Sequence, residues 1–190
     1  MKQDQYPSFI KASGTCVEVG TWHGGFTEAI LSKSDVKKVY CVDPYKHFTN
    51  NEYPDGMNDL SQVEFDALFN KVQTNLTSKF RQKVEFIREL SVKASSQFED
   101  ETLDFVYIDG NHDYKFVLED LKAWHPKVKK GGYLCGDDIY STKLDEHDAD
   151  GNVKRVWSSN CWGKYGTYKA IVDFGKEFEI NGTQFSILKK

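Results

Sequence analysis

The sequence predicts an α/β fold built on a doubly wound, mostly parallel sheet that ends in a C-terminal antiparallel hairpin strand. Short apolar runs alternate with amphipathic helical segments along the chain of 190 residues. The spacing of these runs suits right-handed strand–helix–strand crossovers between parallel strands. Near the C-terminus, Asn181-Gly182 separates two short runs, and this dipeptide strongly favours a β-hairpin.

The individual elements follow from composition and periodicity. Strands are expected at residues 15–19, 38–42, 84–87, 103–108 and 133–136, which are apolar runs rich in β-branched and aromatic residues. Helices are expected at residues 25–32, 63–80, 92–98, 113–124 and 168–174, and short final strands at 177–180 and 184–188. This alternation is that of a Rossmann-like sheet. We expect a single domain over residues 1–190.

Composition narrows the possible partners. The net charge is −4, and the Lys and Arg residues do not form a stripe that could follow a phosphate backbone, so a nucleic-acid partner is not expected. No apolar stretch reaches membrane-spanning length, and the first residues lack the apolar core of a signal peptide. These features predict a soluble, cytoplasmic protein without a membrane partner.

Four cysteines are present, and none belongs to a CxxC pair or a Cys/His cluster that would indicate zinc. Cys16, Cys41 and Cys135 lie inside predicted strands, where a thiol behaves as a small apolar side chain. We therefore expect buried free thiols.

Three carboxylates and one histidine follow two strands that should be neighbours. Asp109 ends one apolar run, Asp137 and Asp138 end the next, and His112 comes three residues after Asp109. In open parallel sheets the ligand lies beyond the carboxyl ends of the strands, so these side chains should converge on one site. Crowded carboxylates repel one another unless a cation or a shared proton intervenes. A hard divalent metal such as Mg²⁺ is the simplest explanation, and capping or turn roles are the alternative.

The first strand leads into a glycine-rich turn. Glu18, Gly20 and Gly24 form an ExGxxxG arrangement, in which the glycines allow a tight turn and a close approach of a ligand to the backbone. The pattern is not GxGxxG, which argues against a dinucleotide. Asp43 ends the second strand, where an acid can accept hydrogen bonds from a ribose diol. Together these residues predict an adenosine-type ligand.

Two positions near this turn have alternative interpretations. Ser91 follows the third strand and could meet an adenine edge or cap the next short helix. Glu18 could contact a positively charged amino group of the ligand or satisfy backbone donors in the turn.

Two long irregular stretches, residues 44–60 and 139–166, leave the carboxyl edge of the sheet. Long loops in a compact domain are often functional lids. They carry several aromatic residues, which are Tyr45, Phe48, Trp157 and Trp162. These rings could stack on a sugar or an aromatic acceptor, or could pack against a second subunit in a homo-oligomer.

These motifs resemble those of class I S-adenosylmethionine-dependent methyltransferases. The resemblance rests on ExGxxxG, on the acid after the second strand, and on the stretch IDGNHDYKFVLEDLKAWHPKVKKGGYLCGDD. Within that superfamily the chain looks like the small family 24 methyltransferases, which are similar to metal-dependent O-methyltransferases of macrolide sugars. The match extends over residues 15–188.

The resemblance implies S-adenosylmethionine as the methyl donor and a hydroxyl of a small molecule or sugar as the acceptor. It implies that Asp109, Asp137 and Asp138 ligate Mg²⁺ and that His112 is the general base, while Asp109 also serves the donor site. One departure is that the sugar enzymes have Glu where this chain has Asp137. Another is the short segment before the first strand, which lacks the cap helices of many relatives, so the acceptor cannot be carried over.

The sequence also fits three functions other than a metal-dependent methyltransferase. A metal-independent methyltransferase could use the same scaffold and would be indifferent to chelators. A nicotinamide-dependent oxidoreductase or epimerase would need a Tyr-x-x-x-Lys pair, and Tyr165 and Lys169 have that spacing, although the glycine pattern does not fit. A protein with this fold could also bind the ligand without turnover.

Overall fold

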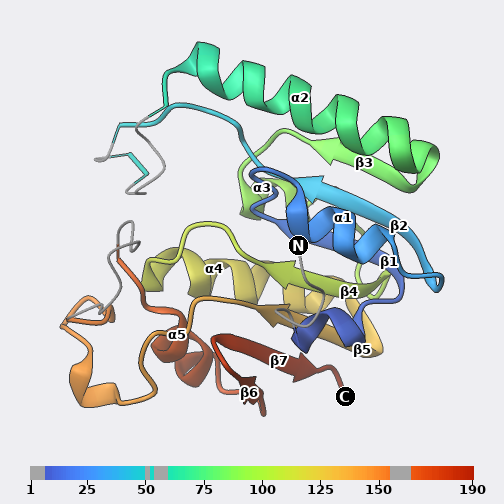
Figure 1. Ribbon diagram of the computed structural model, residues 1–190. Coiled ribbons are helices and arrows are strands. Elements are labelled where there is room, and N and C mark those ends of the chain that lie inside the picture. The colour runs from blue at the N-terminus through green and yellow to red at the C-terminus, as the bar shows by residue number, and fades with distance from the viewer. Residues whose placement is uncertain (1–6, 50–51, 54–59, 155–163) are drawn as a thin grey trace.

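The computed structural model describes residues 7–49, 52–53, 60–154 and 164–190. Its sheet contains β1 (Gly14–Val19), β2 (Val36–Val42), β3 (Val84–Ile87), β4 (Leu103–Ile108), β5 (Val128–Gly136), β6 (Glu179–Asn181) and β7 (Gln184–Leu188). The strand order is β3-β2-β1-β4-β5-β7-β6 (Figure 1). The first five strands are parallel, and β7 is antiparallel to both β5 and β6. The predicted Rossmann-like fold class is therefore confirmed.

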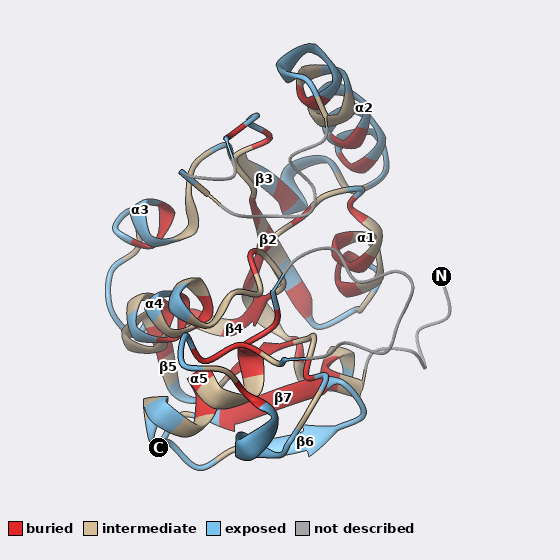
Figure 2. Cartoon of the chain, turned by 90° about the vertical axis from the view of Figure 1, so that its left-hand side faces the viewer, coloured by how far each residue is buried: buried red, intermediate tan, exposed pale blue. Residues whose placement is uncertain are grey.

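Helices cover both faces of the sheet. The helices are α1 (Gly25–Leu31), α2 (Gln62–Phe80), α3 (Ser91–Ser95), α4 (Tyr114–Trp124) and α5 (Thr167–Phe174). Figure 2 shows α1 and α2 on one side of the strands and α3, α4 and α5 on the other. Each face has its own apolar core, because successive strand residues point in opposite directions. Phe105 and Tyr107 of β4 pack with α1 and α2, whereas Val106 and Ile108 pack with α4 and α5.

Local capping explains where two helices begin. Ser61 and Glu64 form a reciprocal capping box at the start of α2. Asp113 is the N-cap of α4, since its side chain accepts a hydrogen bond from the Lys115 backbone amide. Both helices lie within one residue of the predicted positions.

The structure differs from the expected elements in several bounds: for example, β2 begins two residues earlier, at Val36, and α3 ends three residues earlier, at Ser95. Strand β5 begins at Val128 and not at residue 133, because Val128 pairs with Leu103 of β4, and the Lys-Lys-Gly-Gly segment lies in a register shift before Tyr133 pairs with Phe105. The hairpin turn is Gly182-Thr183, one residue later than predicted, since Asn181 pairs with Gln184. A 3₁₀ helix, η2 (Pro7–Lys11), precedes β1 and packs near β5 and β7.

The cysteines in the described part of the chain are buried and free, as expected: Cys16, Cys41 and Cys135. Burial raises the pKa of Cys16 and of Cys135 to about 12, so these thiols stay protonated. Cys161 lies outside the described residues. Among the helices that the structure describes, none is both long and apolar enough to cross a lipid bilayer.

Candidate active site

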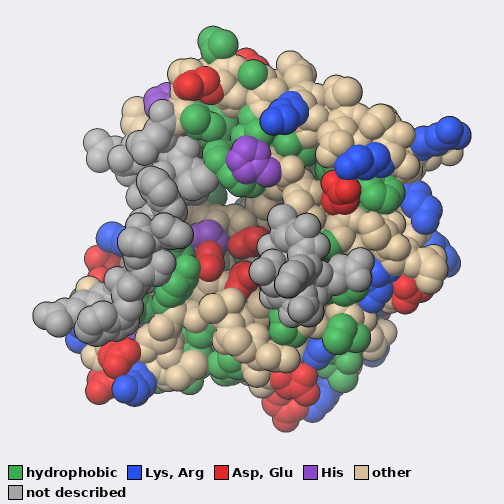
Figure 3. Space-filling model, in the orientation of Figure 1, with side chains coloured by type: hydrophobic (Ala, Val, Ile, Leu, Met, Phe, Trp, Pro, Cys, Tyr) green, Lys and Arg blue, Asp and Glu red, His purple; other side chains and the backbone are tan. Residues whose placement is uncertain are grey.

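A cavity of about 330 Å³ opens at the carboxyl ends of β1, β2 and β4. Its lining combines parts of the glycine turn, the loop after β2, the segment after β4 and the segment after β5. Figure 3 shows acidic side chains and a histidine gathered in this hollow. The predicted site residues that line it are Gly20, Asp43, Ser91, Asp109, His112 and Asp138. The sheet edge therefore brings together most of the residues that the sequence selected.

The turn after β1 requires glycine at two positions. Gly20 has φ +87, and a Cβ there would lie 1.9 Å from the carbonyl oxygen of Asp109. Gly24 has φ +74 and is the N-cap of α1, where a Cβ would lie 2.9 Å from Val72. Gly20 thus allows β1 and β4 to approach at the cavity, whereas Gly24 serves the packing of α1 on α2.

Glu18 lies beneath the turn and is only 1% exposed. Its carboxyl group accepts a hydrogen bond from the Thr27 hydroxyl in α1. Burial raises the pKa of Glu18 well above its usual range, which favours the protonated form. Glu18 is not among the described residues that line the cavity. Both suggested roles of Glu18 stay predictions, since Thr27, its hydrogen-bond partner, belongs to α1 and not to the turn.

Asp43 lies in the cavity wall at the end of β2. One carboxylate oxygen accepts the backbone N–H of Trp22 at 2.9 Å, and the other accepts the N–H of Tyr45 at 2.8 Å. A carboxylate at the end of the second strand is a suitable acceptor for the hydroxyls of a ribose diol. Asp43 can therefore bind a diol while it also connects two loops.

Ser91 also lines the cavity, but it does not cap α3, because the N-cap residue is Leu90. The Ser91 hydroxyl accepts a hydrogen bond from Trp124 Nε1 at 2.8 Å, and its O–H donates a hydrogen bond to the Asp120 carboxylate. A hydroxyl has one donor and two acceptor positions, so one lone pair remains for an amino group of a ligand.

Asp120, which accepts the hydrogen bond from Ser91, has a raised pKa that should make the stability of the protein depend on pH. Asp120 is 4% exposed, and burial raises its pKa to about 7, although the Ser91 hydrogen bond opposes the shift. Because the folded pKa lies above the unfolded value of about 3.9, the folded protein binds more protons between about pH 4 and 7. Protonated Asp120 therefore contributes its full stability at low pH. As the pH rises to about 7, the free energy of unfolding falls by about 4 kcal/mol at most because Asp120 must ionise in a buried site.

Asp120→Asn should therefore flatten the pH dependence of the free energy of unfolding between about pH 4 and 7 and stabilise the protein at pH 8. Urea unfolding of both proteins at several pH values measures this directly. Asp113→Asn is a suitable control, since Asp113 is a partly exposed N-cap on the same segment. Equal pH profiles for wild type and Asp120→Asn would show that Asp120 ionises normally.

Three titratable side chains meet at the mouth of β4 and β5. His112 Nε2 lies 2.8 Å from Asp138 Oδ2 and 3.5 Å from Asp109 Oδ1. One potential ligand atom from each residue falls within 4.8 Å of the others. Asp138 has φ +65, an uncommon backbone conformation for a non-glycine residue, and this directs its carboxylate to His112. Unusual backbone geometry of this kind often occurs at functional sites.

The charges in this cluster are strongly coupled. Burial raises the pKa of Asp109 to about 6, although His112 opposes the shift. For His112, burial alone would lower the pKa, but the carboxylates of Asp109 and Asp138 outweigh it and raise the pKa to about 10. A protonated imidazole offsets only one of the two carboxylates, so the cluster is left with a net negative charge when both acids are ionised. That residual charge is what a cation site requires.

Asp137 is the predicted metal ligand that the structure does not bring into this cluster. Its Oδ1 accepts the Thr183 hydroxyl and the Asp138 N–H, and its Oδ2 accepts the Tyr107 hydroxyl at 3.2 Å. These partners turn the carboxylate toward the C-terminal hairpin. The set assembled at the cavity is Asp109, His112 and Asp138, in place of the expected three aspartates.

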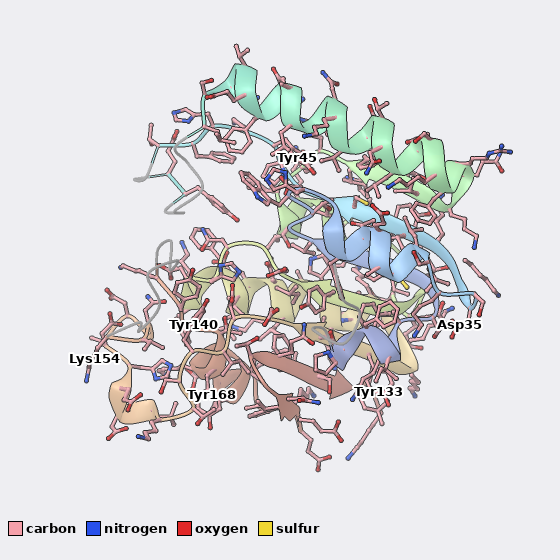
Figure 4. The ribbon with its side chains drawn as sticks, in the orientation of Figure 1. Asp35, Tyr45, Tyr133, Tyr140, Lys154 and Tyr168 are labelled. Atoms are coloured by element: carbon pink, nitrogen blue, oxygen red, sulfur yellow. The ribbon has the colours of Figure 1, made fainter. Side chains whose placement is uncertain are left out.

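The long loops contribute aromatic rings to the cavity: Tyr45, Phe48, Tyr53, Tyr140 and Tyr165. Figure 4 shows Tyr45 and Tyr140 on opposite sides of it. The ring of Tyr165 stacks on His112 at 5.3 Å. Trp157 and Trp162, which the sequence also suggested for this region, lie outside the described residues.

Comparison with known proteins agrees with this architecture. A family model described as a methyltransferase domain, methyltransferase family 24, matches residues 17–139. The uncharacterized protein R132 of Acanthamoeba polyphaga mimivirus is 25% identical over 166 residues, which cover 85% of this chain and 67% of the viral protein.

Solved structures share the fold at low identity. An O-methyltransferase family protein from Burkholderia thailandensis has a TM-score of 0.62 at 15% identity, and the match covers 99% of this chain but 54% of that protein. An rRNA methylase from Streptococcus thermophilus has a TM-score of 0.54 at 14% identity, and the match covers 93% of this chain and 86% of that protein.

The family match extends over most of the chain, from β1 to the residue after Asp138. It contains the glycine turn, the acid after β2 and the Asp109–His112–Asp138 cluster. The chain therefore belongs to methyltransferase family 24, within the class I S-adenosylmethionine-dependent methyltransferases.

Proposed function

We propose that this protein transfers the methyl group of S-adenosylmethionine to a hydroxyl of a small molecule or a sugar, with Mg²⁺ and His112 as a general base. The observation that carries the proposal is the position of the Asp109–His112–Asp138 cluster in the wall of the same cavity as Gly20, Asp43 and Ser91. The end of the cavity with Gly20, Asp43 and Ser91, which we call the donor end, has the groups that can bind a nucleoside. The end with the Asp109–His112–Asp138 cluster, the acceptor end, has the carboxylates for a metal and the imidazole for a base.

The donor end is supported by complementary hydrogen bonding. Asp43 lies in the cavity wall, where its carboxylate can serve as the acceptor for a ribose diol, and Ser91 retains one lone pair for an adenine amino group. Gly20 lines the cavity, and its lack of a side chain lets the turn after β1 approach the backbone of Asp109. In this arrangement the sulfonium end of the donor would face Asp109 and His112.

The acceptor end must turn a weak nucleophile into a stronger one. In the transfer, the acceptor oxygen forms a bond to the methyl carbon while the carbon–sulfur bond breaks, and that electron pair remains on sulfur. The hydroxyl proton passes to the imidazole of His112, which has to be neutral to accept it. The surrounding rings of Tyr140 and Tyr165 hold the acceptor and exclude water.

The donor atoms fit a divalent cation with a preference for oxygen. Asp109 and Asp138 would hold Mg²⁺ through carboxylate oxygens, and the nitrogen of His112 is better suited to proton transfer than to Mg²⁺. When bound, Mg²⁺ would balance the carboxylate charge, which favours neutral imidazole, and would make an acceptor hydroxyl more acidic.

One observation favours a metal-independent methyltransferase as the second candidate. The 2.8 Å contact between His112 and Asp138 already satisfies both charges without a cation. The nicotinamide alternative has less support, because Lys169 pairs with Asp173 and lies over the ring of Tyr114, although it has the required spacing from Tyr165.

Thermal unfolding with S-adenosylmethionine, S-adenosylhomocysteine or NAD, each with and without Mg²⁺, tests the proposal. Ligand at 100 times its dissociation constant stabilises a protein by about 2.7 kcal/mol, which raises Tm by several degrees. We expect both sulfur nucleosides to raise Tm and NAD to have no effect. Stabilisation by NAD alone would contradict the proposal.

A screen of sugars and phenols with radiolabelled donor then identifies the acceptor class. Turnover should stop in EDTA and return when Mg²⁺ is added. Full turnover in EDTA would favour the metal-independent candidate.

A further inference from the structure

Two non-glycine residues with left-handed backbone geometry lie beside each other in the donor end of the cavity. Trp22, in the glycine turn, has φ +44, and Tyr45, after β2, has φ +40. Both line the cavity. L-residues rarely adopt this region, and they stay there only when surrounding contacts hold them.

The contacts that hold them form a closed ring with Asp43. One oxygen of Asp43 accepts the Trp22 N–H at 2.9 Å, and the other accepts the Tyr45 N–H at 2.8 Å. The Tyr45 hydroxyl closes the ring by donating to the Trp22 carbonyl oxygen at 2.7 Å. Two of these three hydrogen bonds join the loop after β1 to the loop after β2, and the third lies within the loop after β2. We call the three bonds together the Asp43 clamp.

The clamp is fixed from outside by α2 and by the residue after β3. Arg88 Nη2 donates to the Tyr45 carbonyl oxygen at 2.6 Å, and Gln62 Nε2 donates to the same oxygen at 3.1 Å. The Tyr45 ring is 1% exposed and lies 5.3 Å from the ring of Phe69. Tyr45 is therefore immobilised at its ring and its backbone, and its hydroxyl reaches the turn.

The phenol is also in the right protonation state to act as a donor. Burial, together with the nearby carboxylate of Asp43, raises the pKa of Tyr45 well above its ordinary value. The Tyr45 hydroxyl stays protonated throughout the range in which the protein would be assayed, so its bond to Trp22 does not depend on pH.

We propose that Tyr45 is a positioning residue for the methyl donor: its hydroxyl holds Trp22 in the left-handed conformation and so keeps the turn and Asp43 in the shape that binds the nucleoside. This rests on the proposed function, because it assigns the donor to this end of the cavity. A turn that is already shaped loses less conformational freedom when the ligand binds.

Tyr45→Phe removes the hydroxyl and keeps the ring. Calorimetric titration with S-adenosylhomocysteine should show about three- to tenfold weaker binding, since one buried hydrogen bond is lost. The kcat at saturating donor should change less than about twofold, because the interaction is the same in ground and transition states. Tyr133→Phe is the matched control: Tyr133 lies on β5, away from Tyr45 in Figure 4, and should bind like wild type.

A double-mutant cycle with Trp22→Gly isolates the cause. Glycine adopts φ near +44 without strain, so in this variant the backbone at position 22 no longer needs the Tyr45 hydroxyl to keep it in the left-handed conformation. Adding Tyr45→Phe to Trp22→Gly should weaken binding less than about twofold.

Three results would overturn the assignment. One is wild-type affinity in Tyr45→Phe together with a lower Tm, which indicates a structural role only. Another is an equal loss of affinity in both backgrounds. The third is no binding by the unaltered protein, which overturns the proposed function itself and this assignment with it.

Discussion

Asp138→Asn is expected to lower the rate of methyl transfer by about 10² to 10⁴. The substitution keeps the size of the side chain but removes the negative charge that lies 2.8 Å from His112 Nε2. It also removes one of the two carboxylates proposed for Mg²⁺. Steady-state rates with the acceptor found by screening measure the effect. Binding of S-adenosylhomocysteine should change less than about twofold, because Asp43 and Ser91 are untouched.

Asp137→Asn provides the informative comparison at the adjacent position. The amide oxygen can still accept the Thr183 hydroxyl and the Asp138 N–H, so the backbone at Asp138 keeps its support. We expect a loss of less than about tenfold, which is well below that of Asp138→Asn. If both variants lost the same activity, Asp137 would be a ligand, as the family resemblance implies. An active Asp138→Asn would remove the basis for the cluster's role.

Gly20→Ala is expected to destabilise the fold by about 3 to 5 kcal/mol. The new Cβ would lie 1.9 Å from the carbonyl oxygen of Asp109, which is backbone and cannot rotate away. The residue would also keep φ +87, which alanine rarely adopts. The midpoint of urea unfolding measures the loss, which is large beside a typical total stability of about 5 to 15 kcal/mol.

Gly131→Ala separates backbone strain from steric overlap. Gly131 also has positive φ, +80, but nothing lies within 4 Å of a Cβ built there. Its substitution should cost about 1 kcal/mol. If Gly20→Ala were as mild as Gly131→Ala, β1 and β4 would have to separate easily, and the close approach at Gly20 would not define the cavity.

The sequence predicted the sheet because its signals are local. Apolar runs flanked by amphipathic helices specified β1 to β4, and β3 and β4 have the predicted bounds. Where packing overrode local preference, the bounds differ. Strand β5 begins earlier because Val128 pairs with Leu103 of β4 ahead of a register shift, and the hairpin turn lies one residue later than predicted, at Gly182-Thr183.

For the site, strand ends predicted which residues gather but not how they orient. Asp109 and Asp138 meet His112 as expected from the crossover. Asp137 turns away because Thr183 and Tyr107 come from strand pairings that no local pattern specifies. Such partners are separated by tens of residues, so only the folded chain reveals them.

The Asp43 clamp was missed for the same reason. Tyr45 was selected only as one of several loop aromatics, and Trp22 was not selected at all. One sequence feature could have indicated it: Trp22 is a bulky residue inside a glycine turn, where positive φ is common, so other contacts have to hold it there.

A crystal structure with S-adenosylhomocysteine and Mn²⁺ as a substitute for Mg²⁺ would locate the methyl donor and the metal in one experiment. We expect an anomalous scattering peak in contact with the carboxylates of Asp109 and Asp138, and the nucleoside between Asp43 and Ser91. A nucleoside outside this cavity, or Mn²⁺ bound away from both carboxylates, would contradict the proposed function.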